Sequence, residues 1–405
     1  MEKIPLVRKQ YLTTYIFVTS LFMLWGIALS MGDVLNRHFQ KVLHVSLAES
    51  GLVQFSLFGA YAVMGIPAGW LMKKYGYKNG VLVGLCLYAA GALLFIPAAG
   101  AESFTFFRIA LFVLACGLAT LEAVAHPFSA ALGDEERSEQ RINLSQTFNA
   151  VGTIIGPTLG GFFILRAALT GETQQDLFSV KILYAAIGLV VLSIAFAFWF
   201  VKAPSIQLPI DKSTRGYNHL FKIKHFRWAA ITQFFNVAAQ GGTWAFFINY
   251  AVKHMPNMSD EAASYYFSVS MVMMLVGRMV GTYLMNFIAP NKLLAIFAAG
   301  SVCLCLGISQ HQGWFSFACL IGLQFTFSIM FPTIFGLGLR NLGDLREKAA
   351  SIIVMGVVGG AVFPPLMGWV ADQHGVANAY LMPIICYIVI FLFGLRLYKV
   401  DDQQR

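Results

Sequence analysis

Charged residues are scarce in this chain: Asp, Glu, Lys and Arg make up 12% of its 405 residues, whereas hydrophobic residues make up 58%. That balance excludes an ordinary soluble protein, in which about a quarter of the residues are charged. The six cysteines all fall inside apolar segments, and none has a plausible disulfide partner in a loop. We therefore expect the cysteines to be small core residues, and we expect neither a metal nor another cofactor.

Several catalytic and nucleotide-binding motifs are also missing. The sequence has no GxxxxGK[ST] phosphate-binding loop, no HExxH motif and no GxSxG on a plausible elbow, so an ATP-driven pump or an intramembrane hydrolase has no support. The apolar segments contain no cluster of Lys and Arg, which a phosphorylated or strongly anionic ligand would require. An enzyme is therefore not expected.

Long apolar runs are what the chain has in abundance. A helix of about 20 apolar residues spans the hydrocarbon core of a bilayer. Twelve such runs cover residues 11–35, 47–72, 79–99, 103–132, 143–166, 179–201, 228–252, 262–288, 291–309, 313–339, 350–371 and 378–398. The predicted fold is an all-α membrane protein of twelve transmembrane helices, with no room for a soluble domain.

The net charge of +9 is explained by where the basic residues lie. If the N-terminus is cytoplasmic, 21 of the 28 Lys and Arg residues fall in cytoplasmic segments and 6 in outer segments, with Arg278 inside or at the edge of a span. The positive-inside rule then predicts that both termini are cytoplasmic. The basic balance is a signal of topology, so the expected partner is the lipid bilayer and no nucleic acid is expected.

The spans form two sets of six, separated by the longest hydrophilic stretch. The predicted organisation is an N-terminal half 1–201, a cytoplasmic linker 202–227 and a C-terminal half 228–405. Glycine and proline recur 208 residues apart: Gly152, Pro157 and Gly160 match Gly360, Pro365 and Gly368. Two parallel six-helix repeats are the plan of major facilitator transporters, in which the substrate site lies near the midplane between the halves.

Two carboxylic acids interrupt the apolar spans. Asp33 lies near the end of the first span, and Glu122 lies in the middle of the fourth. An ionisable group at membrane depth costs several kcal/mol unless it faces a cavity or a partner, so it marks a functional site by default. Protonation removes the charge, which makes both acids candidates for coupling transport to a proton.

Each acid also has a structural interpretation. Asp33 can reach the outer membrane edge and be solvated there. Glu122 can form an internal ion pair with His126, which lies four residues further along the same helix face. The position of Glu122 in mid-span favours the functional interpretation more strongly than the position of Asp33 does.

Uncharged polar residues form one stripe in each half. The stripes are Asn143, Gln146, Asn149 and Thr153 in span five, and Gln233, Asn236, Gln240 and Trp244 in span seven. Residues three or four apart share a helix face. Amides offer donors and acceptors together, which suits neutral hydroxyl-rich ligands, and the rings of Trp25 and Trp244 can stack on the apolar face of a sugar. The alternative is hydrogen bonding between helices as structural glue.

Several short segments are typical of one family. They are residues 24–25, 32–35, 65–69, 72–74, 121–122, 127–128, 143–149, 331–335 and 341–343. Through them the chain resembles the fucose–proton symporters of the major facilitator superfamily over essentially its whole length. Lys73 stands where the loop signature of the superfamily usually has Asp, a departure that is characteristic of the fucose branch.

The resemblance implies individual roles. Asp33 matches the aspartate of the family that is implicated in proton coupling, and Glu122 matches the glutamate that links protonation to sugar binding. Gln146 and Asn149 match polar residues of the central cavity, and Gln240 matches another in the opposing half. These assignments agree with the interpretation drawn from the spans and the stripes.

The identity of the sugar is less constrained. Fucose permeases have an Asn-rich stretch with a sugar contact before the aspartate, whereas this chain has Ser30 there, which is shorter and donates one hydrogen bond. The family also includes carriers of glucose, galactose and N-acetylglucosamine. L-fucose is the leading expectation, and Asn236 is a candidate for setting the choice of sugar.

The sequence therefore predicts a secondary active transporter, a monomer of the bacterial inner membrane that takes up a neutral monosaccharide with a proton by alternating access. Asp33 and Glu122 are the predicted proton-coupling residues. The predicted substrate-binding residues are Glu122, Gln146, Asn149, Asn236, Gln240, Trp244, Ser30 and Trp25. One alternative is a drug or metabolite exporter on the same fold, which would favour an apolar or acidic cavity. Another is a membrane enzyme acting on lipid-linked sugars.

Overall fold

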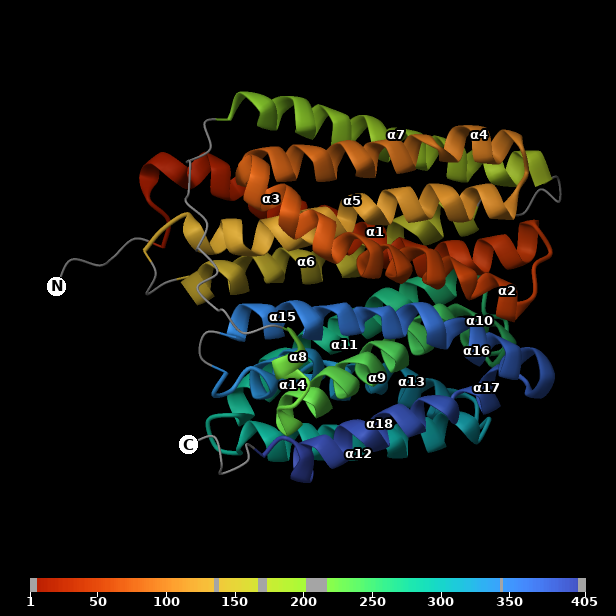
Figure 1. The fold of residues 1–405 in the computed structure, drawn as a ribbon. Helices are drawn as coiled ribbons and strands as arrows, with labels where there is room; N and C mark the ends of the chain where they lie inside the picture. The colour runs from red at the N-terminus through yellow and green to blue at the C-terminus, as the bar shows by residue number, and fades with distance from the viewer. Residues whose placement is uncertain (1–5, 135–137, 167–172, 202–216, 343–344, 400–405) are drawn as a thin grey trace. The chain divides into compact units, whose positions relative to one another are not determined.

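The computed structural model describes residues 6–134, 138–166, 173–201, 217–342 and 345–399, and in these ranges it contains helices and no strands (Figure 1). The helices up to residue 200 are η1 (Lys9–Tyr11), α1 (Leu12–Val42), α2 (Leu47–Ser50), α3 (Leu52–Leu93), α4 (Phe95–Gly100), α5 (Phe104–Ala131), α6 (Ser138–Gly160), the π-helix η3 (Gly161–Leu165) and α7 (Thr173–Phe200). The predicted all-α fold is confirmed.

The second part of the chain is built in the same way. Its helices are α8 (Tyr217–Leu220), α9 (Lys224–Ala245), α10 (Phe247–His254), α11 (Asp260–Leu284), α12 (Pro290–Ser309), α13 (Trp314–Phe327), α14 (Met330–Gly338), α15 (Arg346–Met355), η5 (Gly356–Val358), α16 (Gly359–His374), α17 (Val376–Ala379), α18 (Met382–Leu392) and the π-helix η6 (Phe393–Leu397). Short breaks interrupt several predicted spans, so one span often contains two or three helices.

The predicted spans correspond closely to the observed helices. Within the described residues, eleven helical stretches are long and apolar enough to cross a membrane. The remaining predicted span, 228–252, is occupied by α9 and α10, which meet at Phe246. The amides of its polar stripe make this stretch more hydrophilic than the others, as the sequence indicates.

Helix α3 joins two predicted spans into one element. Spans 47–72 and 79–99 were expected to be separate, and the break between them is a single non-helical residue, Gly76, with φ 79° and ψ 173°. Only glycine adopts this backbone region at no steric cost. These two spans are therefore joined at Gly76 without a loop.

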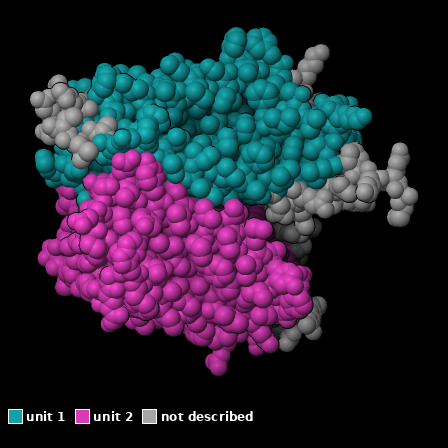
Figure 2. Space-filling view, turned by 180° about the vertical axis from the view of Figure 1, so that it is seen from behind, with its two compact units in different colours: residues 1–44, 59–209 teal, residues 45–58, 210–405 magenta. Residues whose placement is uncertain are grey.

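The chain separates into two compact units. Unit 1 contains residues 1–44 and 59–209, and unit 2 contains residues 45–58 and 210–405 (Figure 2). Of the predicted linker 202–227, residues 202–216 lie outside the described residues, and the rest includes α8 and the start of α9. Helix α2 and the first turns of α3 thus group with the second unit, which the sequence did not indicate.

Within unit 1, α1 and α6 pack closely through glycine. A Cβ atom at Gly26 of α1 would overlap with the Asn149 carbonyl oxygen of α6, and one at Gly152 of α6 would overlap with the Met23 carbonyl oxygen of α1. Small residues allow such close approach of membrane helices. The contact fixes the position of α6, with Asn149 of its polar stripe, against the turn of α1 that contains Met23 and Gly26.

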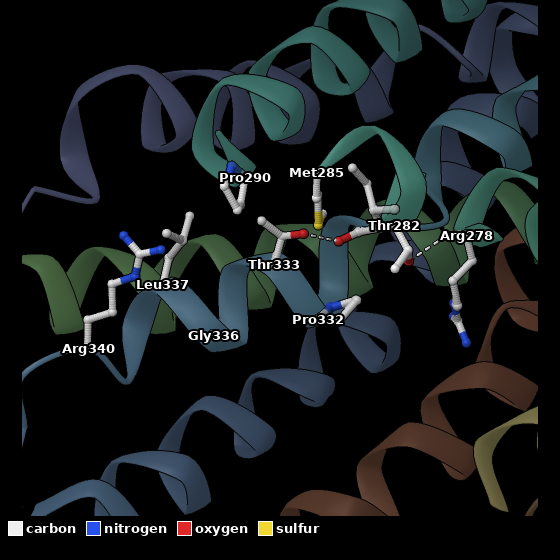
Figure 3. A pocket seen from close by; sticks show the side chains of 10 residues that line it. Arg278, Thr282, Met285, Pro290, Pro332, Thr333, Gly336, Leu337 and Arg340 are labelled. Atoms are coloured by element: carbon white, nitrogen blue, oxygen red, sulfur yellow. Dashed lines mark hydrogen bonds between the residues drawn. The ribbon is translucent and has the colours of Figure 1, made fainter. Parts of the chain in front are cut away.

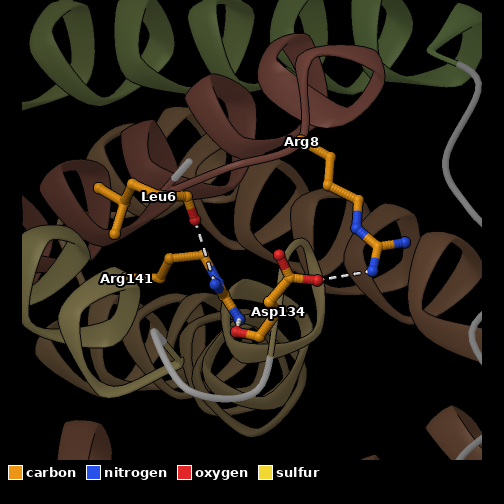
Figure 4. A network of polar contacts seen from close by, with 4 residues as sticks. All are labelled: Leu6, Arg8, Asp134 and Arg141. Atoms are coloured by element: carbon orange, nitrogen blue, oxygen red, sulfur yellow. Dashed lines mark hydrogen bonds and ion pairs between the residues drawn. The ribbon is translucent and has the colours of Figure 1, made fainter. Parts of the chain in front are cut away.

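A buried arginine holds the start of α6 in place (Figure 4). The Arg141 side chain is 0% exposed, and its guanidinium donates to the backbone carbonyls of Ser129, Leu6 and Asp134 at 3.1, 3.1 and 3.0 Å. The Tyr15 hydroxyl donates to the Arg141 carbonyl at 2.8 Å. This network ties the N-terminal segment, the end of α5 and the start of α6 together.

Candidate functional site

The two predicted proton-coupling acids lie in different helices of unit 1. Asp33, on α1, is 3% exposed and is among the buried charged residues of the protein. Glu122, on α5, is half-buried. The near-complete burial of Asp33 argues against the alternative in which its carboxyl reaches water at the membrane edge.

His126 binds its neighbours in a way that the sequence did not predict. Its Nδ1 atom lies 2.9 Å from the Glu122 backbone carbonyl oxygen, and its Nε2 atom lies 2.6 Å from Nε2 of Gln146 on α6. Because a carbonyl oxygen only accepts, Nδ1 carries the hydrogen and Nε2 accepts from the amide. Both ring nitrogens are thus occupied, so His126 forms no ion pair with the Glu122 carboxylate. The ion pair between His126 and Glu122 that the structural interpretation requires is thus not formed in the described part of the chain.

One buried donor lies beside the Glu122 carboxyl, and a second lies next to the first. The Tyr61 hydroxyl, from α3, lies close enough to interact with both the Glu122 carboxyl and the Trp25 indole. Neither this hydroxyl nor Nε1 of Trp25 has a hydrogen-bond partner of good geometry. Buried polar groups are nearly always paired, so unpaired ones in a group point to a ligand. Tyr61 could not be predicted as a site residue, since one tyrosine in an apolar run gives no distinguishing signal.

Two of the remaining predicted residues of unit 1 are hydrogen-bonded to backbone carbonyl oxygens. The Asn149 amide donates to the Phe22 carbonyl oxygen at 3.1 Å. The Ser30 hydroxyl donates to the Gly26 carbonyl oxygen of its own helix at 2.9 Å, so its only hydrogen is already used. Trp25 is half-buried, and its ring packs edge-on against His126 with centroids 6.1 Å apart. The structure therefore brings Trp25, Glu122 and Gln146 together around His126.

In unit 2, the polar stripe of α9 is buried and largely unpartnered. Gln233 and Asn236 are both 0% exposed, and none of their side-chain nitrogen and oxygen atoms has a hydrogen-bond partner. Gln240, one turn further along, is half-buried. An unsatisfied buried amide costs about 1–3 kcal/mol, so interhelical bonding does not explain these two residues.

Trp244 ends the stripe and is fixed by a neighbour. It is 6% exposed, and its Nε1 donates to Oε1 of Gln324 on α13 at 2.8 Å. The second polar atom of that amide, Nε2, has no hydrogen-bond partner. Gln324 is a single amide in an apolar segment, and only its hydrogen bond to Trp244, which joins α9 to α13, reveals the relation between the two residues.

One pocket lies away from these residues, between α11, α14 and the start of α12 (Figure 3). Its volume is about 300 Å³, and its lining includes Arg278, Thr282, Thr333 and Arg340. The Arg278 Nε atom donates to the Ser328 carbonyl oxygen at 3.4 Å. None of the predicted binding residues lines this pocket, so it is distinct from the polar stripes.

Comparison with known proteins gives the family. Residues 13–357 match the family model described as Major Facilitator Superfamily, and the chain belongs to that superfamily of membrane transporters. Within it, the chain belongs to the family of the L-fucose–proton symporters. It is 36% identical over 408 residues to the "L-fucose-proton symporter" of Escherichia coli, which covers 95% of this chain and 93% of that protein.

Other relatives and structures agree. The chain is 33% identical to the "Glucose/galactose transporter" of Brucella abortus, with coverage of 96% and 95% of the two chains. The crystal structure of the E. coli fucose:proton symporter in the outward conformation aligns with a TM-score of 0.71 at 35% identity, covering 97% of this chain and 100% of that one. A bacterial homologue of the lysosomal transporter Spinster, 12% identical, aligns with a TM-score of 0.80 over 98% and 99% of the chains and shows the shared fold.

Proposed function

We propose that this protein is a proton-coupled symporter that takes up a neutral monosaccharide, with L-fucose or a related hexose as its substrate. One observation carries the proposal: the Glu122 carboxyl lies beside the buried Tyr61 hydroxyl, which also neighbours the Trp25 indole N–H, and neither donor has a well-formed hydrogen bond. Sugar hydroxyls accept such bonds. The names of the relatives, which include fucose and glucose or galactose carriers, agree with this chemistry.

The proposed cycle follows from the cost of burying charge. Asp33 binds the coupling proton, and Glu122 senses both the proton and the sugar. Protonation neutralises carboxylates that are costly to occlude within the membrane. Binding residues from both halves, including Gln146 and Asn149 in one and Asn236, Gln240 and Trp244 in the other, hold the sugar. Ser30 contributes its oxygen as an acceptor. The halves then rock and open to the other side.

The setting of the protein is part of the same proposal. We infer that it is a monomer of the bacterial inner membrane, embedded in lipid, with both termini in the cytoplasm, as the basic segments indicate. The functional halves are proposed to be 1–201 and 228–405, joined by the linker 202–227. A multi-pass membrane protein is already established by the family and by the apolar helices.

The two alternatives have less support. An exporter of apolar compounds would not need buried amides such as Gln233 and Asn236 with unpaired polar atoms. A membrane enzyme acting on lipid-linked sugars is set aside, because the relatives are named as transporters and symporters.

The direct test is sugar-induced alkalinisation. In lightly buffered cells expressing the protein, we expect one of L-fucose, D-galactose, D-glucose and N-acetylglucosamine to raise the external pH on addition. Glu122→Gln, which keeps the shape of the side chain but carries no proton, should abolish that rise. Absence of a pH change with every sugar, with the protein present in the membrane, would contradict proton-coupled symport of these sugars.

The contact between Gln324 and Trp244 gives a second expectation. Gln324→Leu removes the acceptor of the indole N–H, so the ring loses the bond that fixes its orientation. We expect the KM for the sugar to rise about tenfold, as for the loss of about 1.4 kcal/mol of binding, with little change in maximal uptake. Gln324→Glu, which keeps an acceptor, should restore part of the affinity. Equal KM values in all three proteins would show that Trp244 needs no such support.

A further inference from the structure

A short segment of the chain is attached to α16 of unit 2. This docking segment, residues 45–58, contains α2 and the first turns of α3. The backbone N–H groups of Leu47 and Ala48 donate to the two carboxylate oxygens of Asp372, at 3.0 and 2.9 Å. Asp372 lies near the end of α16, so a single carboxylate supplies partners for the first two amides of α2. Bonds from N–H groups to a carboxylate are about twice as strong as neutral ones.

The other free amides of α2 are satisfied within the docking segment itself. The Ser46 hydroxyl accepts from the Glu49 N–H at 3.1 Å, and the Glu49 carboxylate accepts from the Ser46 N–H at 2.9 Å. This is a capping box, which stabilises a helix start from its own residues. The start of α2 thus has two kinds of support: one that is internal to the segment and one that depends on α16.

The packing beneath these bonds leaves no space for side chains. A Cβ atom at Gly51 would lie 2.7 Å from the backbone nitrogen of Pro365, and one at Gly368 would overlap with the Leu47 carbonyl oxygen. Further along, a Cβ atom at Gly360 would lie only 2.8 Å from the ring of Phe58. The contact therefore follows α16 over several turns, and it is built for close fit.

We propose that the docking segment is a releasable latch on α16, and that Asp372 is its catch. The proposal rests on the proposed function, since alternating access requires helices at the end predicted to face outside to part and rejoin. In the latched state Asp372 holds α2. In the released state these two bonds and the glycine contacts are lost, while the capping box of Ser46 and Glu49 keeps α2 folded as it leaves.

Hydrogen exchange on the purified full-length protein, without sugar, tests the latch. In Asp372→Asn the amide offers one weaker acceptor in place of two charged ones, and in Gly368→Ala the added methyl group separates the surfaces. We expect backbone amides of the docking segment, and those of the facing turns of α16, to exchange at least about tenfold faster in both variants. The matched control is Glu49→Gln, which alters the capping box and should leave exchange in α16 unchanged.

Two results would overturn the latch. Exchange in Asp372→Asn equal to that of the unaltered protein would show that the carboxylate does not hold the segment. Faster exchange in α16 of Glu49→Gln, equal to that in Asp372→Asn, would show that general loosening is the cause. The exchange measurement uses neither a sugar nor a pH gradient. Its failure is therefore separate from failure of sugar-induced alkalinisation, which tests the proposed function.

Discussion

Replacing Asp33 by asparagine is expected to lower proton-coupled sugar uptake at least about 100-fold while leaving sugar binding within about threefold. Asparagine has nearly the same shape but cannot exchange a proton, so the buried position no longer changes charge during the cycle. Because a charged carboxylate at this depth costs several kcal/mol, reorientation of the unaltered carrier depends on protonation of Asp33, and the variant loses the drive that proton binding supplies. A 100-fold loss corresponds to about 2.7 kcal/mol. The measurement is uptake of labelled sugar into proteoliposomes with and without an imposed pH gradient.

The matched comparison is Glu122→Gln. Because Glu122 lies beside the Tyr61 hydroxyl, which in turn neighbours the Trp25 indole, its replacement should weaken sugar binding as well as coupling. Equilibrium binding of the sugar to the two purified variants therefore separates the two roles. Normal coupling in Asp33→Asn, or equal sugar affinity in the two variants, would contradict the division of labour between the acids.

Replacing Arg141 by methionine is expected to lower the free energy of unfolding by about 3 kcal/mol or more. Methionine fills much of the space but removes the guanidinium donor from three carbonyl oxygens, the buried one of Ser129 and the part-buried ones of Leu6 and Asp134. Each buried group that loses its partner costs about 1–3 kcal/mol. Thermal unfolding in detergent, followed by fluorescence, measures the effect.

The control for this variant lies in the same network. Arg8 and Asp134 form an ion pair at 2.7 Å, with side chains that are 54% and 37% exposed. Exposed ion pairs add little to stability, so Arg8→Gln should leave the unfolding temperature within experimental error. A comparable loss in both variants would mean that the N-terminal segment, and not the buried guanidinium, is what stabilises this end of α6.

The helices could be predicted because hydrophobic length alone identifies them. Runs of about 20 apolar residues have few alternatives to a membrane helix, and α5, α7, α11 and α12 lie close to their predicted ranges. The breaks within spans were less predictable. Phe246, which separates α9 from α10, carries no glycine or proline signal of its own. The grouping of residues 45–58 with unit 2 depends on contacts with α16, such as the one between Leu47 and Asp372, which are 325 residues apart in sequence.

The candidate site was predictable where polarity stands out against an apolar background. Asp33, Glu122 and the amides of α9 were found in this way, and the structure buries Asp33, Gln233 and Asn236. Partners were not predictable, because a hydrogen bond between helices depends on tertiary packing. The bond between His126 and Gln146 joins α5 to α6, and the one between Trp244 and Gln324 joins α9 to α13. The roles of all these residues in transport stay predictions.

The grouping of residues 45–58 with the second unit has a consequence for expressing the protein in pieces. A fragment that contains only residues 210–405 would lack the segment that covers Gly360, Pro365 and Gly368 of α16. Its partner fragment would carry that segment with no surface to receive it. The contact between this segment and α16 therefore favours association of the two fragments. Complementation between separately synthesised fragments should depend on an intact α2 ahead of α3.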